Sequence, residues 1–378
     1  MSGLARLLGA IAADRTDLDL NCFAATTVQL AIDRGLGPLL FHATKNNPYS
    51  AASALQPILQ GADITSRILV HEQLDGLQDI LDALGSSARH VTLLKGISTC
   101  QQYFPVPHLR TMGDIDLLVA PEKQAELETL LRQTGYYQQS ELPPSFYRQH
   151  HHSMPFFHPV RKIWVEVHTQ LFPPKSHLVQ DRIFTNAHVE RSTAPYTIRG
   201  TTTNVLGSEL QIAYLAAHWG GSFPYHRGLM PILDVMYLLK EENSSIKWDK
   251  LLTWLHGSAA TPYVYLLLSF LQHQQLCELA SSVIQRLQGM QKTINLPVLA
   301  ILHKILEKYL VDGYPFGRFA TFNNIAVVWD TLLAQRGATR NLVAVPFRLF
   351  FPPNHPQRFS LGLLGQRLRS VLRTRLAK

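Results

Sequence analysis

Cysteine is scarce in this 378-residue sequence, and long apolar runs are absent. The three cysteines, Cys22, Cys100 and Cys277, lie far apart and form no CxxC pair, which indicates neither a disulfide framework nor a cysteine-rich zinc site. No apolar stretch reaches the roughly 18 residues needed for a helix that spans a membrane. The N-terminus makes a poor signal peptide, because Arg6 interrupts a mildly apolar segment. These absences favour a protein of the reducing cytoplasm.

Charged residues make up only 16% of the chain and hydrophobic residues 46%, which predicts a sizeable buried core rather than disorder. At this length we expect a core domain with helical additions, or two to three domains. The net charge is +8, but six of these charges lie in residues 356–378, which contain no acidic residue. The body is therefore nearly neutral, and its core gives no indication of nucleic-acid binding.

Two aspartates, Asp114 and Asp116, stand inside a hydrophobic run and are separated only by Ile115. Side chains alternate along a strand, so both carboxylates are expected on one face. Two like charges this close repel each other unless a cation lies between them. Because Mg²⁺ prefers hard oxygen ligands, the pair predicts a magnesium site at one edge of a strand.

A turn suited to phosphate precedes the aspartates. Residues 91–94 are predicted to form a buried strand, Gly96 to end it, and Ser98 to cap the short helix that follows. A glycine turn at a helix N-terminus presents free backbone N–H groups, which suit a phosphate. Lys95 and Arg110 would add positive charge there.

A third carboxylate follows the aspartates in the chain. Residues 150–158 are predicted as a strand, with a turn at 159–162. Residues 163–168 are predicted as its hairpin partner, because they are rich in β-branched and aromatic residues. Glu166 and His168 share one face of the second strand. If this strand lies beside the aspartate strand, Glu166 completes a cluster of three carboxylates.

At these residues the chain resembles the nucleotidyltransferases of the polymerase-β superfamily. Within it, the chain is similar to a bacterial family marked by the motifs LKG, R…DIDLLV and VE-H. The resemblance assigns Gly96 and Ser98 to the phosphate turn, Asp114 and Asp116 to the Asp-x-Asp pair, and Glu166 to the third carboxylate. It also implies two Mg²⁺ ions on these three carboxylates, or Mn²⁺ in their place.

The histidine-rich stretch from His150 to His158 invites a zinc interpretation, but the sequence has no HExxH helix and no cysteine partner nearby. We therefore favour substrate contact or a structural role for His152 and His168. His218, Arg227 and Asp234 resemble polar positions of the family's helical region. For Asp234, a buried salt bridge is favoured over catalysis.

The resemblance implies an α+β fold, with a small mixed sheet of polymerase-β type between N-terminal helices and a C-terminal helical bundle. Separate helices are expected at 52–59 and 65–84, and a later helix is expected to start at Ser208 and end at Gly220-Gly221. The expected parts are an N-terminal helical region (1–88), a catalytic core (89–205), a helical domain (206–350) and a basic amphipathic tail (351–378).

The leucines of the tail fall on one face of a predicted helix, with the arginines mostly elsewhere. Docking of this helix onto the protein body is the favoured interpretation. Contact with an anionic membrane surface comes next, which would make the protein peripheral to the membrane.

The predicted function is transfer of a nucleoside monophosphate from an NTP to an unidentified hydroxyl acceptor. Glu166, with Asp116, would orient and deprotonate that hydroxyl. Two alternatives stay open. One is a catalytically silent nucleotide-binding or interaction module, favoured by the long interval between Gly96 and Asp114. The other is phosphotransfer to a small molecule.

Overall fold

The computed structural model describes residues 3–47, 54–148, 150–226, 228–242, 244–311 and 324–351, together with 362 and 365. Arg227 and nearly all of the basic tail lie outside these residues. Within the described parts of the chain, no helix is long and apolar enough to cross a membrane.

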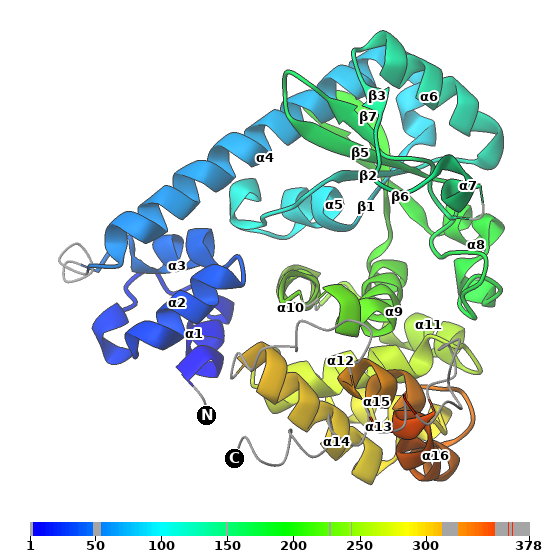
Figure 1. Cartoon of the computed structure of the whole chain (residues 1–378). Helices are drawn as coiled ribbons and strands as arrows, with labels where there is room; N and C mark the ends of the chain where they lie inside the picture. The colour runs from blue at the N-terminus through cyan, green and yellow to red at the C-terminus, as the bar shows by residue number, and fades with distance from the viewer. Residues whose placement is uncertain are drawn as a thin grey trace.

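The strands form one mixed seven-stranded sheet in the order β3-β4-β5-β2-β1-β7-β6. The sheet lies in the upper part of Figure 1, above the C-terminal helices. The pairs β2–β5 and β1–β7 are parallel, and the other pairs are antiparallel. Strands β1 and β2 lie inside the sheet, and every one of their residues is buried. The strands are β1 (Thr92–Leu94), β2 (Ile115–Leu118), β3 (Tyr137–Gln138), β4 (Phe156–His158), β5 (Ile163–His168), β6 (Thr193–Ile198) and β7 (Thr201–Leu206).

Both faces of the sheet are covered, and strand alternation divides the core in two. Leu93 and Leu117 pack in one apolar cluster, whereas Leu94 and Leu118 pack in the cluster that includes the helical parts of the chain. Asp116 lies opposite Leu94 in the sheet, so its carboxylate belongs to the face directed at the helices.

The N-terminal helices are α1 (Gly3–Ala12), α2 (Ala25–Asp33), α3 (Gly37–Thr44) and α4 (Gln56–Leu84). Two separate helices were expected over the range of α4, but it is one helix of 29 residues that runs from the small N-terminal helices to the sheet (Figure 1). Tertiary contacts hold the part of α4 that was expected to separate the two helices. Asp63 pairs with His108, and the Ser66 hydroxyl donates to the His108 carbonyl. Gly61 is tolerated inside the helix because these contacts fix the turns around it.

Shorter helices accompany the sheet: α5 (Lys95–Gln102), α6 (Gln124–Gln133), α7 (Pro144–Tyr147) and α8 (Asn186–Arg191). Two predictions are wrong here. Ser98 does not cap α5, because the helix begins at Lys95 and Ser98 lies inside it with its hydroxyl bonded to Gln102. Only Phe156–His158 of the strand expected at 150–158 pairs regularly, since Pro155 precedes it and cannot donate to a ladder.

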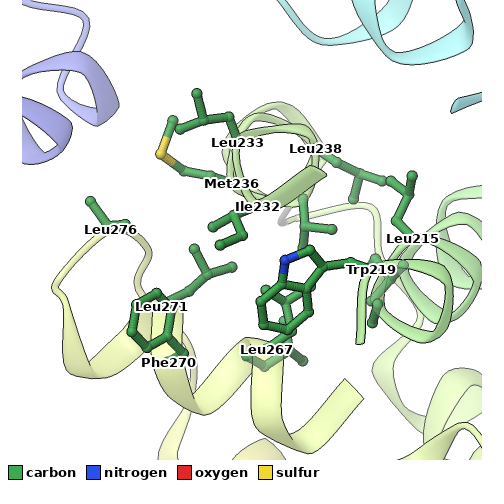
Figure 2. Close-up of a cluster of buried hydrophobic side chains, with 14 of the residues drawn as sticks. Leu215, Trp219, Ile232, Leu233, Met236, Leu238, Leu267, Phe270, Leu271 and Leu276 are labelled. Atoms are coloured by element: carbon green, nitrogen blue, oxygen red, sulfur yellow. The ribbon is translucent and has the colours of Figure 1, made fainter. Parts of the chain in front are cut away.

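The C-terminal half is helical: α9 (Ser208–His226), α10 (Met230–Glu242), α11 (Trp248–Leu255), α12 (Thr261–His273), α13 (Ser281–Met290), α14 (Leu296–Leu306) followed by a π-helical turn (Glu307–Val311), α15 (Asn324–Leu332) and α16 (Ala338–Phe350). Helices α9, α10 and α12 pack through large apolar side chains, as Figure 2 shows for Trp219, Met236 and Phe270.

Helix α9 continues through Gly220-Gly221, where it was expected to end. The glycines serve packing instead. The ring of Tyr263 on α12 occupies the space where a side chain at Gly220 would lie, and Trp329 Nε1 donates to the Gly220 carbonyl at 2.7 Å. Contacts from two other helices therefore stabilise α9 at a point where the local sequence favours a stop.

Candidate active site

The aspartate strand β2 and the glutamate strand β5 are parallel neighbours, and Asp116 lies directly opposite Glu166. This is the adjacency that the sequence prediction required. Asp114 immediately precedes β2 and has the same side-chain direction as Asp116. Three carboxylates therefore meet on the face of the sheet that is directed at the helical domain.

Asp116 is buried, at 2% exposure, and two basic side chains contact it. Lys95 Nζ donates to Asp116 Oδ1 at 2.7 Å, and His168 Nε2 lies 2.8 Å from the same oxygen. His168 Nε2 also lies 3.4 Å from Glu166 Oε2. His168 is fully buried, so it links the two carboxylates from behind rather than facing solvent.

The three carboxylates have different affinities for protons. Burial raises the pKa of Asp116, but Lys95 and His168 outweigh burial and hold that pKa well below its usual value. Burial likewise opposes ionisation of Glu166, yet the hydrogen bond from His168 and other nearby charges lower its pKa. The charge of Asp116, followed by burial, raises the pKa of Asp114 to about 7. Asp114 thus carries the repulsion that remains in the cluster.

Lys95 stands at the turn between β1 and α5, in a left-handed conformation with φ of 47°. This backbone region costs a non-glycine residue about 1–2 kcal/mol. Burial disfavours its charge, but Asp116 outweighs burial and raises the pKa of Lys95 above its usual value. The turn is tight as well. A Cβ on Gly96 would lie 3.0 Å from Met112 Cβ and 3.3 Å from the Arg110 guanidinium.

Arg110 and Asp234 form a buried, two-pronged ion pair. The Nε–Oδ1 and Nη2–Oδ2 distances are both 2.8 Å, and the Thr99 hydroxyl donates to Oδ1 at 2.8 Å. This is the buried salt bridge that the sequence favoured for Asp234. The guanidinium lies beside Gly96, and neither Arg110 nor Asp234 lines the cavity described next. Ser98 is also buried and does not line it.

A cavity of about 1370 Å³ lies between the carboxylates and the helical domain. Lys95, Asp114 and Glu166 line the sheet side. The opposite side comes from α9, where His218 and Gly220-Gly221 contribute, from Tyr263 on α12, and from the C-terminal part of α15 with the segment that follows it. The helical domain therefore supplies a large share of the candidate substrate site.

Sequence reasoning missed two segments that contribute polar side chains to this cavity. Lys175 and His177 lie in the loop after β5, and Asp330 and Arg336 lie at the end of α15 and beyond it. No motif surrounds these residues. Only their polar character within otherwise apolar or proline-rich segments could have singled them out.

Three consecutive histidines, His150, His151 and His152, line the cavity beside Glu166. His152 Nε2 lies 3.7 Å from Glu166 Oε2, and its Nδ1 faces the Ser153 carbonyl oxygen at 2.8 Å. Burial lowers the pKa of His152, although Glu166 opposes this effect. Burial followed by His152 lowers the pKa of His150 to about 4. The loop pairs with the end of β5 at an isolated antiparallel bridge between His152 and His168.

Two groups of side chains in the described residues have ligand atoms close enough to hold a metal ion. Asp116, Glu166 and His168 form one group, and the three consecutive histidines form the other; in each, the ligand atoms lie within 4.8 Å of one another. Asp114 is the remaining carboxylate at the edge of the first group.

Comparisons with known proteins identify the family of the chain. No curated protein matches the sequence. Among solved structures, the chain is similar to the solution structure of the antibiotic-resistance factor ANT(2'')-Ia, at 15% identity and a TM-score of 0.34, over 54% of this chain and 98% of that one. The profile of the family described as "Uncharacterised nucleotidyltransferase" matches residues 24–305, which are 282 of the 378 residues. The chain therefore belongs to this nucleotidyltransferase family.

Proposed function

We propose that the protein transfers a nucleoside monophosphate from an NTP to a hydroxyl acceptor, with a catalytic centre of polymerase-β type. The observation that carries the proposal is the register of β2 against β5, which sets Asp116 opposite Glu166 with Asp114 beside them. Family membership supports the reaction class. The cavity volume of about 1370 Å³ exceeds the roughly 300–1,000 Å³ of an ordinary small-molecule site, so it has room for two substrates.

Asp114, Asp116 and Glu166 would hold the divalent cations. The donor set fits Mg²⁺, or Mn²⁺, because it consists of carboxylate oxygens, and the raised pKa of Asp114 shows that the cluster lacks positive charge at that residue. Such ions, when bound, polarise the phosphoryl group and neutralise its charge. The Lys95 ammonium group donates to Asp116 Oδ1. If a divalent cation binds at this oxygen, Lys95 would have to move aside or share the oxygen with the cation.

The protein's own groups would perform the remaining tasks. Glu166, which lines the cavity, would accept the proton of the acceptor hydroxyl. His168 is buried and bonded to Asp116, so it would position the carboxylates rather than contact substrate. His152 and His218 line the cavity and would contact substrate.

At the turn, Lys95 would bind the phosphates, because it lines the cavity beside Asp114 and Glu166, whereas Gly96 is buried and does not line it. Gly96 keeps the turn compact, since a side chain there would press on Met112 and Arg110. Arg110 and Ser98 would support this turn from behind rather than bind phosphate, because both are buried and bonded elsewhere.

Isothermal titration calorimetry with each of the four NTPs in Mg²⁺ tests the proposal. We expect binding of at least one NTP that requires the metal and disappears in Asp114→Ala. Asp249→Ala is the matched control, because it removes an exposed carboxylate on α11. Failure of all four NTPs to bind, or equal binding by Asp114→Ala, would refute the proposal.

A labelling experiment then identifies the reaction. Incubation with a candidate acceptor should place label from the α-phosphate of the bound NTP on that acceptor. Transfer of label from the γ-phosphate instead would identify a phosphotransferase.

A further inference from the structure

We propose that His150, His151 and His152 form a binding site for a divalent transition metal of the Zn²⁺ type, separate from the carboxylate cluster. One ring nitrogen of each histidine lies within 4.8 Å of the others. Imidazole nitrogen is a preferred zinc ligand, and three histidines are a sufficient protein ligand set for a zinc site that keeps a position open. Rotation of the side chains would bring these nitrogens to one common ion, at Zn–N distances of about 2.0–2.1 Å.

The backbone of His151 and His152 is held in place at the end of β5, and the His150 amide donates to the Tyr147 carbonyl at 3.1 Å. The Ser153 amide donates to the Val167 carbonyl at 2.9 Å, and the Thr169 amide donates to the His151 carbonyl at 2.9 Å. His152 pairs with His168 as a bridge between these two hydrogen bonds. The site is therefore largely formed before any metal binds, which reduces the entropy lost on binding.

Among the described residues, two buried ring nitrogens of these histidines lack a hydrogen-bond partner. Nδ1 of His150 and Nδ1 of His151 are buried and have no hydrogen-bond partner in the described part of the chain, and His151 is only 8% exposed. Buried polar atoms are normally satisfied, because an unpaired one loses the hydrogen bond that water would provide. Coordination of a metal would satisfy such nitrogens.

His152 has the arrangement of a metal ligand supported by the backbone. Its Nδ1 lies 2.8 Å from the Ser153 carbonyl oxygen, which can only accept, so Nδ1 carries the proton. In the neutral ring Nε2 then keeps its lone pair, 3.7 Å from Glu166 Oε2. A lone pair and a carboxylate repel each other unless a cation lies near both. In metal sites, a histidine typically donates its other N–H to a carbonyl or carboxylate in this way.

Packing of the aromatic rings explains less of this geometry than metal binding does. His150 stacks on Phe146, and the three imidazole centroids lie 4.2–4.9 Å apart. Stacking would hold the rings together, but it leaves both Nδ1 atoms without a partner and does not explain why three imidazoles meet beside a carboxylate.

The two metal sites would differ in chemistry. Mg²⁺ prefers the oxygen ligands of the carboxylates, whereas the nitrogen ligands of the histidines favour Zn²⁺, Co²⁺ or Ni²⁺. All three histidines line the cavity, so water or a substrate oxygen could take the open position of the transition metal. This inference requires neither nucleotide nor acceptor and stands apart from the proposed transfer reaction.

The test is a titration of the chelator-treated full chain with Zn²⁺, and in parallel with Co²⁺, in a large excess of Mg²⁺. The excess Mg²⁺ occupies oxygen sites, so we expect one equivalent of Zn²⁺ to bind elsewhere, with a Co²⁺ absorption spectrum that indicates nitrogen ligands. Affinity should fall at least about tenfold in both His150→Ala and His151→Ala. Circular dichroism of the metal-free variants checks that they fold.

Two further variants separate the histidine site from its surroundings. His177→Ala removes a histidine that lines the same cavity outside the cluster, and it should bind Zn²⁺ like the wild type. Asp114→Asn alters the carboxylate cluster and should also retain Zn²⁺ binding. No Zn²⁺ binding in excess Mg²⁺, unchanged binding by the folded His150 and His151 variants, or loss of binding in Asp114→Asn would overturn the proposal.

Discussion

The ion pair between Arg110 and Asp234 allows a stability prediction with a defined size. Asp234→Asn keeps the shape of the side chain but leaves the Arg110 charge buried without a counter-charge. Arg110 is 8% exposed and Asp234 1%, so water cannot replace the lost partner. Breaking one side of a buried pair typically costs about 3–5 kcal/mol, and we expect a loss in this range in the free energy of unfolding.

Urea unfolding followed by circular dichroism measures this loss, and an unchanged slope against urea confirms that the unfolded states are comparable. Thr99→Val removes only the hydroxyl that donates to Asp234 Oδ1, so it should cost less, about 1.5–3 kcal/mol. The double variant Arg110→Met/Asp234→Leu removes both charges and should recover more than half of the stability that Asp234→Asn loses.

The same ion pair supports the turn at Lys95 and Gly96, so the prediction also concerns NTP binding. The Arg110 guanidinium packs against Gly96, next to Lys95. An Arg110 that bound phosphate directly would affect NTP affinity while leaving stability unchanged. A cost below about 1 kcal/mol for Asp234→Asn, with weaker NTP binding by Arg110→Met, would therefore refute the structural role assigned here.

Three other predictions follow from the site and its supports. Asp116→Asn should reduce nucleotidyl transfer on the order of 10³-fold or more while the circular dichroism spectrum stays that of the wild type; retained turnover would exclude the mechanism. In metal-free protein, Asp114 binds its proton more tightly when folded, so its contribution to stability is present below pH 3.8 and is lost as pH rises through about 7. The difference in unfolding free energy between wild type and Asp114→Asn, measured across this range, should show that slope. Gly220→Ala should destabilise the protein by about 1–3 kcal/mol, because its Cβ would lie 2.3 Å from Tyr263 Cδ1, whereas Gly221→Ala, with no atom within 4 Å of its Cβ, should gain about 0.5–1 kcal/mol in thermal or urea unfolding.

Local signals in the sequence were sufficient for the strands that carry the carboxylates. The apolar runs around Leu93 and Leu117 and the β-branched residues of 163–168 identify β1, β2 and β5. The side-chain period of two then places Asp114 with Asp116, and Glu166 with His168. The pairing of β2 with β5 was expected from the family resemblance, because nothing local specifies which strands become neighbours.

Tertiary contacts decided what local patterns could not. Arg110 and Asp234 are 124 positions apart, so no spacing rule could reveal that they neutralise each other. Gly220 and Gly221 are a local stop signal, but Tyr263 and Trp329 fill the space beside the first glycine and keep the helix intact. At Gly220 the free energy of the distant contacts exceeds a local preference of about 1 kcal/mol.

The charges around the candidate site indicate how a nucleotide would enter it. Asp114, Asp116 and Glu166 lie beside two basic side chains, Lys95 and His168, and His168 is buried behind the carboxylates. The burial of His168 disfavours its charge, but the hydrogen bonds that it donates to both carboxylates outweigh burial and raise its pKa. Even with both partners charged, the ionised cluster keeps one negative charge, and Asp114 carries the repulsion. A bare triphosphate would be repelled from this wall, whereas its complex with a divalent cation would be attracted. Lys95 and His168 both pair with Asp116, but they leave this negative charge. We therefore expect an NTP to bind more tightly with a divalent cation than without one.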